Sequence, residues 1–431
     1  MIYYIGLELL LIISYLYKQM VFGIIIWCII VAILYKKRKN RLDLLIKCLI
    51  ASVPISYLEI TCEVGYHIFK IYNFIILLLI LYLLNVIHKA HMTVNKSILL
   101  ASIGILSTQL IRTLFCTDLP SAFIELIQEY ITVFTIGLFA IYIINVHKFT
   151  NVHFNVNEWL DLYYYTTVSA SLGVIYQFLI YNTSGTRIGY TTIWLGRQVF
   201  DLLFTGYSVL TVYIGGGIII AISKLLKGDT AIFHLFSLTI TGFACAINSS
   251  RSGLLSAILI VLIMFVVALL KKKTIRYALL YGAPVFFLMA YLVSFLIRHR
   301  QSLQGGSLFF ANNRDVVAHY AFEQMFNNAL YFLFGKGINS PKIEGVSQHN
   351  MFLEMWTLNG TIFLLAFVVV VIAIVYKTKN KKERYLLWHI LIAHQFISSL
   401  FASTFIVPIL LIVLCSEDEV NKERQKILQQ I

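Results

Sequence analysis

The sequence predicts an all-α, polytopic integral membrane protein with about 12–14 transmembrane helices. Of its 431 residues, 59% are hydrophobic and only 13% are charged, and the mean hydropathy is +0.83. A soluble fold of this size cannot bury so much apolar surface, so the bilayer is the solvent for most of the chain. Five prolines are few for this length. Long helices suit such a composition, because they satisfy their own backbone hydrogen bonds in lipid.

Apolar runs of spanning length recur along the whole chain. The first two and the last two are short for a hydrocarbon core of about 30 Å. An even number of spans places both termini on the same side of the membrane. We found no internal repeat and no soluble domain, so residues 1–431 are predicted to form a single membrane-embedded domain. The runs lie near residues 2–17, 20–35, 42–58, 71–88, 97–115, 125–146, 158–181, 200–223, 230–247, 253–270, 275–297, 350–376, 385–400 and 403–415.

Clusters of basic residues indicate which loops face the cytoplasm. The lysine-rich stretches 36–39, 271–273 and 377–384 all fall in loops of the same parity. Cytoplasmic loops carry an excess of Lys and Arg, so both termini are predicted to be cytoplasmic. The net charge of +14 then reflects topology, because the bases lie in short clusters between spans. Nucleic acid is therefore not an expected partner.

The basic residues on the opposite side differ in kind. Lysine predominates in the predicted cytoplasmic loops, whereas seven of the 11 external Lys and Arg residues are arginines. Arginine's planar guanidinium holds phosphate with two parallel hydrogen bonds and stays charged. The bias predicts an external site for a phosphate-bearing ligand, although an ordinary distribution of surface arginines is the alternative. The seven are Arg112, Arg187, Arg197, Arg251, Arg298, Arg300 and Arg314.

The longest polar interruption, residues 298–349, is the predicted external loop. Asn312-Asn313 is a typical helix N-cap, and Val317, Tyr320, Ala321 and Met325 recur at helical spacing. We therefore expect one amphipathic helix over residues 313–332, near the membrane surface. Flexible glycines at 335 and 337 then lead to the start of the next span.

Two short motifs flank apolar runs at the predicted outer edge. The Ser-Ser-Arg-Ser-Gly turn around Arg251 leaves N–H groups at a helix start open to an anion, although such a charge is often only a topological stop. His349 begins a span directly after the arginine-bearing loop. It titrates near neutral pH and can take a proton from a hydroxyl group. A lone histidine is more commonly a packing residue, and Arg298 and Arg300 can equally extend toward the interface from a helix end.

Together these blocks resemble the O-antigen ligase and polysaccharide polymerase family, which are membrane glycosyltransferases of the GT-C type. One block is SSRSGLLSAILIVLI, beginning at Ser249. The other, from Asn312 to Gly360, is NNRDVVAHYAFEQMFNNALYFLFGKGINSPKIEGVSQHNMFLEMWTLNG. The second is similar to the family pattern of an arginine-led helix, a Gly-x-Gly turn, His-Asn, a Leu and a closing Gly.

The resemblance implies a metal-independent, inverting glycosyl transfer on the outer face of a bacterial inner (plasma) membrane, without a cofactor. The donor would be an oligosaccharide on undecaprenyl pyrophosphate, drawn from the membrane lipid. Arg251 and Arg314 would bind the pyrophosphate and His349 would act as base. Arg187, Arg197, Arg298 and Arg300 are further candidates for pyrophosphate binding. A chain-length regulator and a flippase would be the protein partners.

Three functions stay open at this point. A polymerase joining repeat units of an O-antigen, capsule or exopolysaccharide is preferred. A ligase that transfers finished glycan to lipid A core or protein uses the same donor. A lipid-linked oligosaccharide flippase is the alternative from another class. It predicts paired broken helices or a repeat between halves, and we found neither in the sequence.

Overall fold

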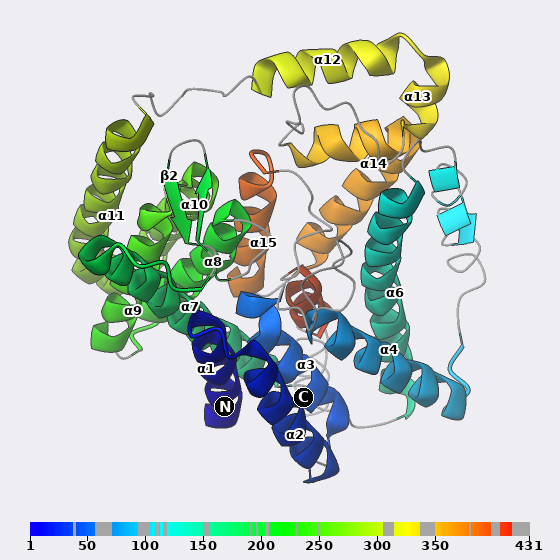
Figure 1. The fold of residues 1–431 in the computed structure, drawn as a ribbon, viewed down its shortest axis with the longest axis horizontal. Coiled ribbons are helices and arrows are strands. Elements are labelled where there is room, and N and C mark those ends of the chain that lie inside the picture. The colour runs from blue at the N-terminus through cyan, green and yellow to red at the C-terminus, as the bar shows by residue number, and fades with distance from the viewer. Residues whose placement is uncertain are drawn as a thin grey trace. The chain divides into compact units, whose positions relative to one another are not determined.

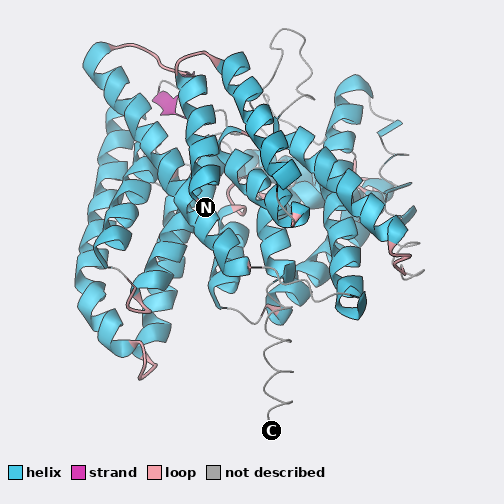
Figure 2. Cartoon of the chain, turned by 90° about the horizontal axis from the view of Figure 1, so that it is seen from below, coloured by secondary structure: helices cyan, strands magenta, loops and turns pink. Residues whose placement is uncertain are grey.

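The structure is a computed structural model in which helices form nearly every described segment (Figures 1 and 2). Contacts divide the chain into two compact units, which are described separately. Unit 1 contains residues 1–75, 155–310 and 381–393, and unit 2 contains the rest. The described residues are 1–37, 40–56, 71–93, 103–104, 106–107, 110, 113–114, 119–149, 155–189, 191–194, 197–200, 202, 207–229, 231–248, 250–304, 314–336, 350–378, 381–397 and 406–415.

Unit 1 is a bundle of apolar helices around α8, which is buried along nearly its whole length. The four glycine and alanine positions of α8 let neighbouring helices approach closely, as small residues do in membrane bundles. Helices α7, α9, α10 and α15 all contact it. The helices of unit 1 are α1 (Ile2–Leu16), α2 (Met20–Lys37), α3 (Arg41–Ser52), the 3₁₀ turn η1 (Val53–Ile55), α7 (Val156–Ser184), α8 (Tyr207–Leu225), α9 (Ala231–Ile247), α10 (Arg251–Leu269), α11 (Ile275–Gln304) and α15 (Lys381–Ala393).

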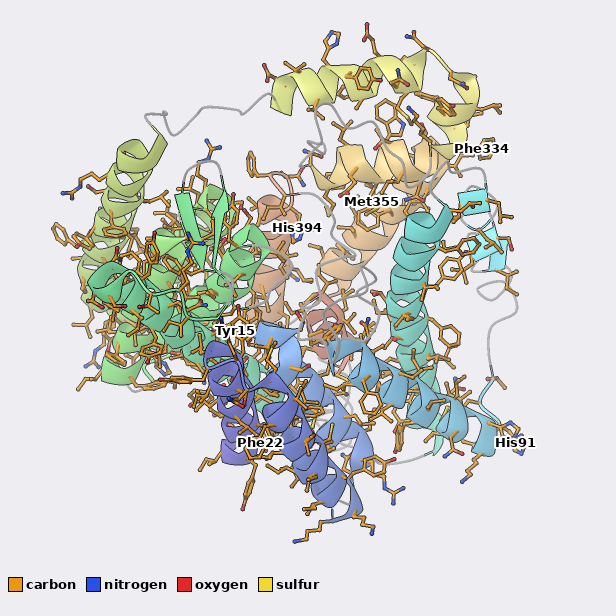
Figure 3. The ribbon with its side chains drawn as sticks, in the orientation of Figure 1. Tyr15, Phe22, His91, Phe334, Met355 and His394 are labelled. Atoms are coloured by element: carbon orange, nitrogen blue, oxygen red, sulfur yellow. The ribbon has the colours of Figure 1, made fainter. Side chains whose placement is uncertain are left out.

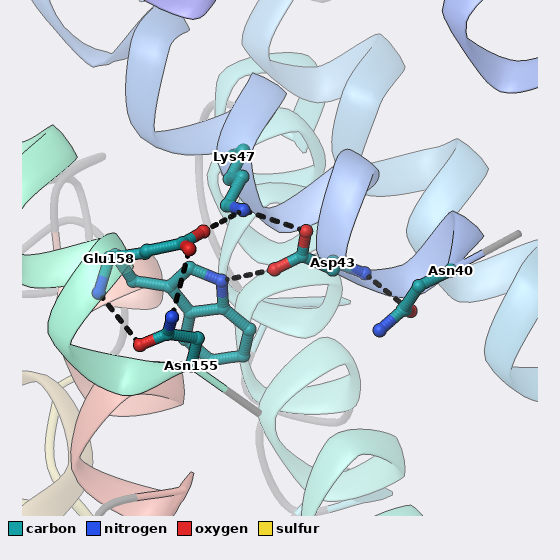
Figure 4. A network of polar contacts seen from close by, with 6 residues as sticks. Asn40, Asp43, Lys47, Asn155 and Glu158 are labelled. Atoms are coloured by element: carbon teal, nitrogen blue, oxygen red, sulfur yellow. Dashed lines mark hydrogen bonds and ion pairs between the residues drawn. The ribbon is translucent and has the colours of Figure 1, made fainter. Parts of the chain in front are cut away.

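A polar network joins the beginnings of α3 and α7 (Figure 4). Asn40 and Asn155 cap the two helices by accepting backbone N–H groups of Asp43 and Glu158. Lys47 Nζ lies 2.8 Å from Asp43 Oδ2 and 2.6 Å from Glu158 Oε2. One ammonium group therefore pairs with a carboxylate from each helix. The Lys47 side chain is only 11% exposed, whereas that of Glu158 is 48% exposed, so the two carboxylates mainly compensate the lysine.

Unit 2 contains α4, of which residues 71–75 belong to unit 1, and the elements that follow the predicted loop. Helix α6 is the longest described helix of unit 2, and it is unbroken. Helix α14 is interrupted at Gly360, which has φ +80° and ψ 177°. The bounds are α4 (Ile71–Lys89), α6 (Leu119–Phe149), α12 (Arg314–Phe326), α13 (Ala329–Phe334), α14 (Met351–Lys377) and a last helix, Ile406–Cys415.

The predicted all-α, polytopic membrane class is confirmed. Six described helices are long and apolar enough to cross a membrane, and four shorter apolar helices accompany them. Helix bounds follow the predicted apolar runs closely in most places. The run 97–115 falls largely outside the described residues, and the total of 12–14 spans and the single domain stay predictions.

Two predicted segments differ from the structure. The run 200–223 was expected to begin a span at 200, but α8 begins at Tyr207, because the antiparallel strands β1 (Thr191–Trp194) and β2 (Arg197–Phe200) precede it. The single helix expected over 313–332 is two helices, since Asn328 caps α13 by accepting from the N–H groups of Leu330 and Tyr331. Of the four residues at helical spacing, Val317, Ala321 and Met325 are fully buried and Tyr320 is partly buried.

Candidate functional site

Five predicted arginine positions belong to one end of unit 1. Helices α7 to α11 run alternately up and down, so α7, α9 and α11 finish where α8 and α10 begin. Aromatic rings tie this end together. Phe243 lies 6.3 Å from Phe178 and 5.3 Å from Phe295, and Phe178 lies 5.8 Å from Phe200. We call it the arginine end, and its arginines are Arg187, Arg197, Arg251, Arg298 and Arg300.

Arg251 is the first residue of α10 and is half-buried. Ser250 is the N-cap but makes no side-chain capping bond; its hydroxyl lies 3.2 Å from that of Ser252. The first N–H groups of α10 are thus not satisfied by a cap side chain. Gly253 lies against the backbone of Thr211, where any Cβ would collide. The turn is therefore packed against α8, and this contact fixes the position of the α10 start at Arg251.

The β-hairpin is held beside this turn. Asn248, buried one residue beyond the end of α9, accepts the N–H of Phe200 through Oδ1 at 3.0 Å. Its Nδ2 group is buried and has no hydrogen-bond partner among the described residues. This bond attaches strand β2, which begins with Arg197, to Asn248, and Asn248 lies three residues before Arg251 in the chain. The side chain of Arg197 lies outside the described part.

The remaining arginines of this end differ in setting. Arg187 is exposed in a short segment that Gln177 ties to α7 by donating to the carbonyl of Ile188 at 3.1 Å. Arg298 is exposed and donates to Ser294 Oγ at 3.0 Å. The external loop was predicted to begin at residue 298, but α11 continues to Gln304, so Arg298 and Arg300 lie in the last turns of that helix. The side chain of Arg300 lies outside the described part.

The opposite end of unit 1 carries lysines. α8 ends, α9 begins, α10 ends and α11 begins there. Lys224 lies in the last turn of α8, and the short connections contain Lys227 and residues 271–273. Within unit 1 the bundle therefore separates the predicted external arginines from the predicted cytoplasmic lysines. This separation is what the parity of the loops predicts, since each helix reverses the direction of the chain.

Sequence reasoning missed a buried histidine behind the arginine turn. His389 of α15 lies between α8 and α10, with Nε2 2.9 Å from the carbonyl of Val212 and Nδ1 3.0 Å from Ser256 Oγ. A carbonyl only accepts, so Nε2 carries the proton. Gly215 leaves room for the ring, because a Cβ there would collide with it. These partners lie 133 and 177 residues away in sequence, so no local pattern points to them.

A buried carboxyl group was also missed. Glu8 of α1 is fully buried; its Oε2 accepts from Ser169 Oγ at 2.8 Å, and its Oε1 has no hydrogen-bond partner among the described residues. Ionisable groups in apolar helices are costly and commonly functional. The sequence did not point to Glu8, because a single Glu in the first apolar run belongs to no recognisable motif.

In unit 2, two glycines bring α13 and α14 into backbone contact. Gly335 and Gly360 both have φ +80°. A Cβ on Gly335 would lie closer than 3.0 Å to the carbonyl of Leu358, and one on Gly360 equally close to that of Leu333. These glycines are the first glycine of the Gly-x-Gly turn and the closing glycine of the second quoted block. We call their contact the glycine crossing.

Hydrogen bonds support the crossing on both sides. The N–H of Lys336 donates to the carbonyl of Thr357 at 2.7 Å, and Thr361 Oγ1 donates to the carbonyl of Phe332 at 2.7 Å. Trp356 Nε1 donates to Thr361 Oγ1 at 2.9 Å. The Thr357 carbonyl beside the break in α14 thus has a partner just after α13, and the Thr361 side chain binds a carbonyl of α13. Non-helical backbone inside an apolar segment is tolerated only under that condition.

An apolar cluster fixes α12 on the first part of α14. Phe322 and Phe326 of α12 place their rings 5.3 and 5.6 Å from that of Trp356. Phe334, the last residue of α13, and Met355 of α14 are labelled in Figure 3. Arg314 begins α12, and its side chain lies outside the described part. The buried members of the cluster are Ala321, Met325, Leu353 and Trp356.

The beginning of α14 is also anchored. Asn350 Oδ1 accepts the N–H of Leu353 at 3.0 Å, and its Nδ2 donates to the carbonyl of Gln395 at 3.2 Å. The N–H of Met351 donates to the carbonyl of His394 at 2.9 Å. His349, the predicted base, lies outside the described residues. It directly precedes this anchored helix start.

Comparison of the chain with protein-family models, with curated proteins and with solved structures finds no match. The assignment of function therefore depends on the residues and on the resemblance described from the sequence.

The glycine crossing leads to a stability prediction. Gly360→Ala should lower the free energy of unfolding by about 3 kcal/mol, because it adds a backbone collision to a φ and ψ region that only glycine occupies readily. Thermal unfolding of the purified protein in detergent, followed by circular dichroism, measures the effect. Gly137→Ala is the matched control, since a Cβ at Gly137 in α6 meets nothing within 4 Å. Equal melting temperatures for the two variants would contradict the crossing.

Proposed function

We propose that this protein is a polysaccharide polymerase. It transfers a glycan from undecaprenyl pyrophosphate to a sugar hydroxyl on the outer face of a bacterial plasma membrane. The supporting observation is the arginine end of unit 1, where Arg187, Arg251 and Arg298 belong to the same end of one packed bundle. The lysines that predict the cytoplasmic face belong to the other end. A predominance of arginine over lysine favours a phosphate ligand over a simple topology signal.

The proposed glycosyl transfer is a single displacement at the anomeric carbon of the donor sugar. The acceptor hydroxyl oxygen attacks the anomeric carbon of the donor sugar, and the bond from that carbon to the pyrophosphate oxygen breaks. The bonding electrons leave with the pyrophosphate, and the hydroxyl proton passes to His349. Attack opposite the leaving group inverts the configuration. Fixed guanidinium groups stabilise the negative charge on the departing pyrophosphate, so the proposal needs no metal ion.

Features around Arg251 support a role in holding the leaving group. Its helix begins without a side-chain cap, and anions bind readily at such helix starts. Packing of Gly253 on Thr211 holds this helix start in place. Preorganised donors of this kind cost no rearrangement when charge develops in the transition state. Arg251 is therefore the arginine to which we assign the most direct contact.

The glycine crossing supports a defined position for His349. It holds α12 and α13 against α14, and the bonds of Asn350 fix the residue that follows His349. A general base must lie within hydrogen-bond reach of the proton it takes. An anchored helix start limits where the base can lie. The ligase alternative uses the same donor chemistry and differs only in its acceptor.

One observation bears on the flippase alternative. Helix α14 is broken at Gly360, and broken helices are common in transporters. Transporters carry such breaks in pairs, related by an internal repeat. Among the helices that the structure describes, α14 alone contains a non-helical residue. The glycosyl-transfer proposal therefore remains the preferred one.

One prediction of the proposed function concerns His349. Cells lacking the protein are complemented with wild type, His349→Ala or His319→Ala at matched membrane levels, and the glycans are separated by gel electrophoresis. A general base contributes about 10²–10⁴-fold in rate, so His349→Ala should replace the polymer ladder by single repeat units. His319, exposed on α12, is the matched control and should leave the ladder intact.

Other outcomes of this experiment are equally informative. Long chains that accumulate on the lipid carrier would identify a ligase and overturn the polymerase. A normal ladder with His349→Ala would remove the histidine from the mechanism.

The second prediction concerns Arg251. Arg251→Ala should slow polymer formation in isolated membranes by about 100-fold, as loss of one charged donor to a developing anion commonly does. Arg251→Lys should recover only part of the rate, because lysine lacks the two-point geometry. Arg276→Ala, exposed at the beginning of α11, is the control. Full activity of Arg251→Ala at normal expression would refute the assignment.

A further inference from the structure

His389 of α15 bonds to both of the helices that form the turn around Arg251. Its Nε2 donates to the carbonyl of Val212 in α8 at 2.9 Å, and its Nδ1 lies 3.0 Å from Ser256 Oγ in α10. Helix α15 packs on both of these helices, which Figure 1 shows beside it. One imidazole ring therefore connects three helices behind the Arg251 turn.

The partner of His389 in α8 is adjacent to the contact that positions the start of α10. Val212 follows Thr211, and a Cβ on Gly253 would lie 2.4 Å from the carbonyl carbon of Thr211. Gly253 is the second residue after Arg251. The bond from His389 thus holds the α8 backbone at the place where the first turn of α10 packs on it.

The partner of His389 in α10 is bonded to that same first turn. Ser256 lies about one and a half turns after Arg251. Its hydroxyl lies 2.5 Å from the carbonyl of Ser252 and 3.1 Å from that of Gly253. The imidazole and the first turn of α10 therefore meet at one oxygen atom, so a shift of the ring would be transmitted to the turn.

Close packing holds the ring in this position. His389 is fully buried, and a Cβ on Gly215 of α8 would lie 2.7 Å from its Cε1 and Nε2 atoms. The same Cβ would lie 3.1 Å from the carbonyl oxygen of Gly253. Gly215 therefore lets both the imidazole and the α10 backbone lie against α8. A buried imidazole bonded at both nitrogens is a rigid link, because losing either bond leaves a buried polar group unsatisfied.

We infer that His389 is a positioning residue for Arg251. Its two hydrogen bonds fix the first turn of α10 relative to α8, and so fix where the Arg251 guanidinium meets the departing pyrophosphate. His389 acts through Ser256 and the helix backbone, and the proton transfer remains with His349. The inference rests on the proposed function, but the link between the helices is testable without it. Misplacement of a reacting or binding group by about 1 Å lowers rates about 100-fold.

Substitution of His389 alone and together with Arg251 tests the positioning role. His389→Phe keeps a ring of similar size and removes both nitrogens. It should slow polymer formation in isolated membranes about 10- to 100-fold. Added to Arg251→Ala, it should cost almost nothing more, because the side chain that it positions is already absent. Losses that simply multiply in the double variant would overturn the inference.

A conservative variant and a matched control separate positioning from general damage to the core. His389→Gln places an amide nitrogen near the Nε2 position and should recover part of the rate. His234 is also buried in unit 1, and its Nδ1 lies 3.0 Å from the Tyr164 hydroxyl, away from the arginine end. His234→Phe should keep the wild-type rate. Equal slowing by the two Phe variants would overturn the inference.

Hydrogen exchange of the purified full-length protein tests the link without any activity. The amides of residues 255–260 bond to the first turns of α10, and they should exchange about tenfold faster in His389→Phe than in wild type. His234→Phe should leave their exchange unchanged. Unchanged exchange in His389→Phe would overturn the link. If the wild type makes no polymer, the proposed function fails, while the exchange result still decides whether His389 holds the start of α10.

Discussion

The need to satisfy every backbone hydrogen bond in lipid governs this structure. Helices meet that need within each segment, and they account for nearly all described residues. The exceptions are therefore informative. The β-hairpin pairs its own strands and donates one N–H to Asn248. The break at Gly360 lies against α13, where Thr357 and Thr361 take part in the bonds that support it. Irregular backbone occurs where the chain also carries its candidate functional residues.

Because successive helices run in opposite directions, alternate loops of the chain lie at opposite ends of the unit 1 bundle. Arginine predominates in loops of one parity and lysine in loops of the other, so the two ends of the unit 1 bundle differ in their basic residues. Arginine provides a planar fork for a phosphate in a fixed orientation, whereas lysine provides a mobile point charge. The proposal of a pyrophosphate at the arginine end follows from this difference.

Hydropathy predicted most helix bounds, because the bilayer sets both the length and the composition of a span. Helical spacing also indicated one face of α12, where Val317, Ala321 and Met325 are buried and Tyr320 is partly buried. Polar capping was underestimated: Asn328 divides the expected helix 313–332 in two. Contacts distant in sequence could not be predicted. His389 meets Ser256 across 133 residues, and Gly335 meets Gly360 only because α14 is broken there.

The central claim is that the arginine end faces outward, where a lipid-linked donor would meet it. Thr186 and Lys272 are exposed at opposite ends of unit 1. Each can be replaced by cysteine in a chain freed of its six native cysteines. A membrane-impermeant maleimide applied to intact cells should label Thr186→Cys, and should label Lys272→Cys only after permeabilisation. The reverse pattern would place the arginines in the cytoplasm and contradict the account.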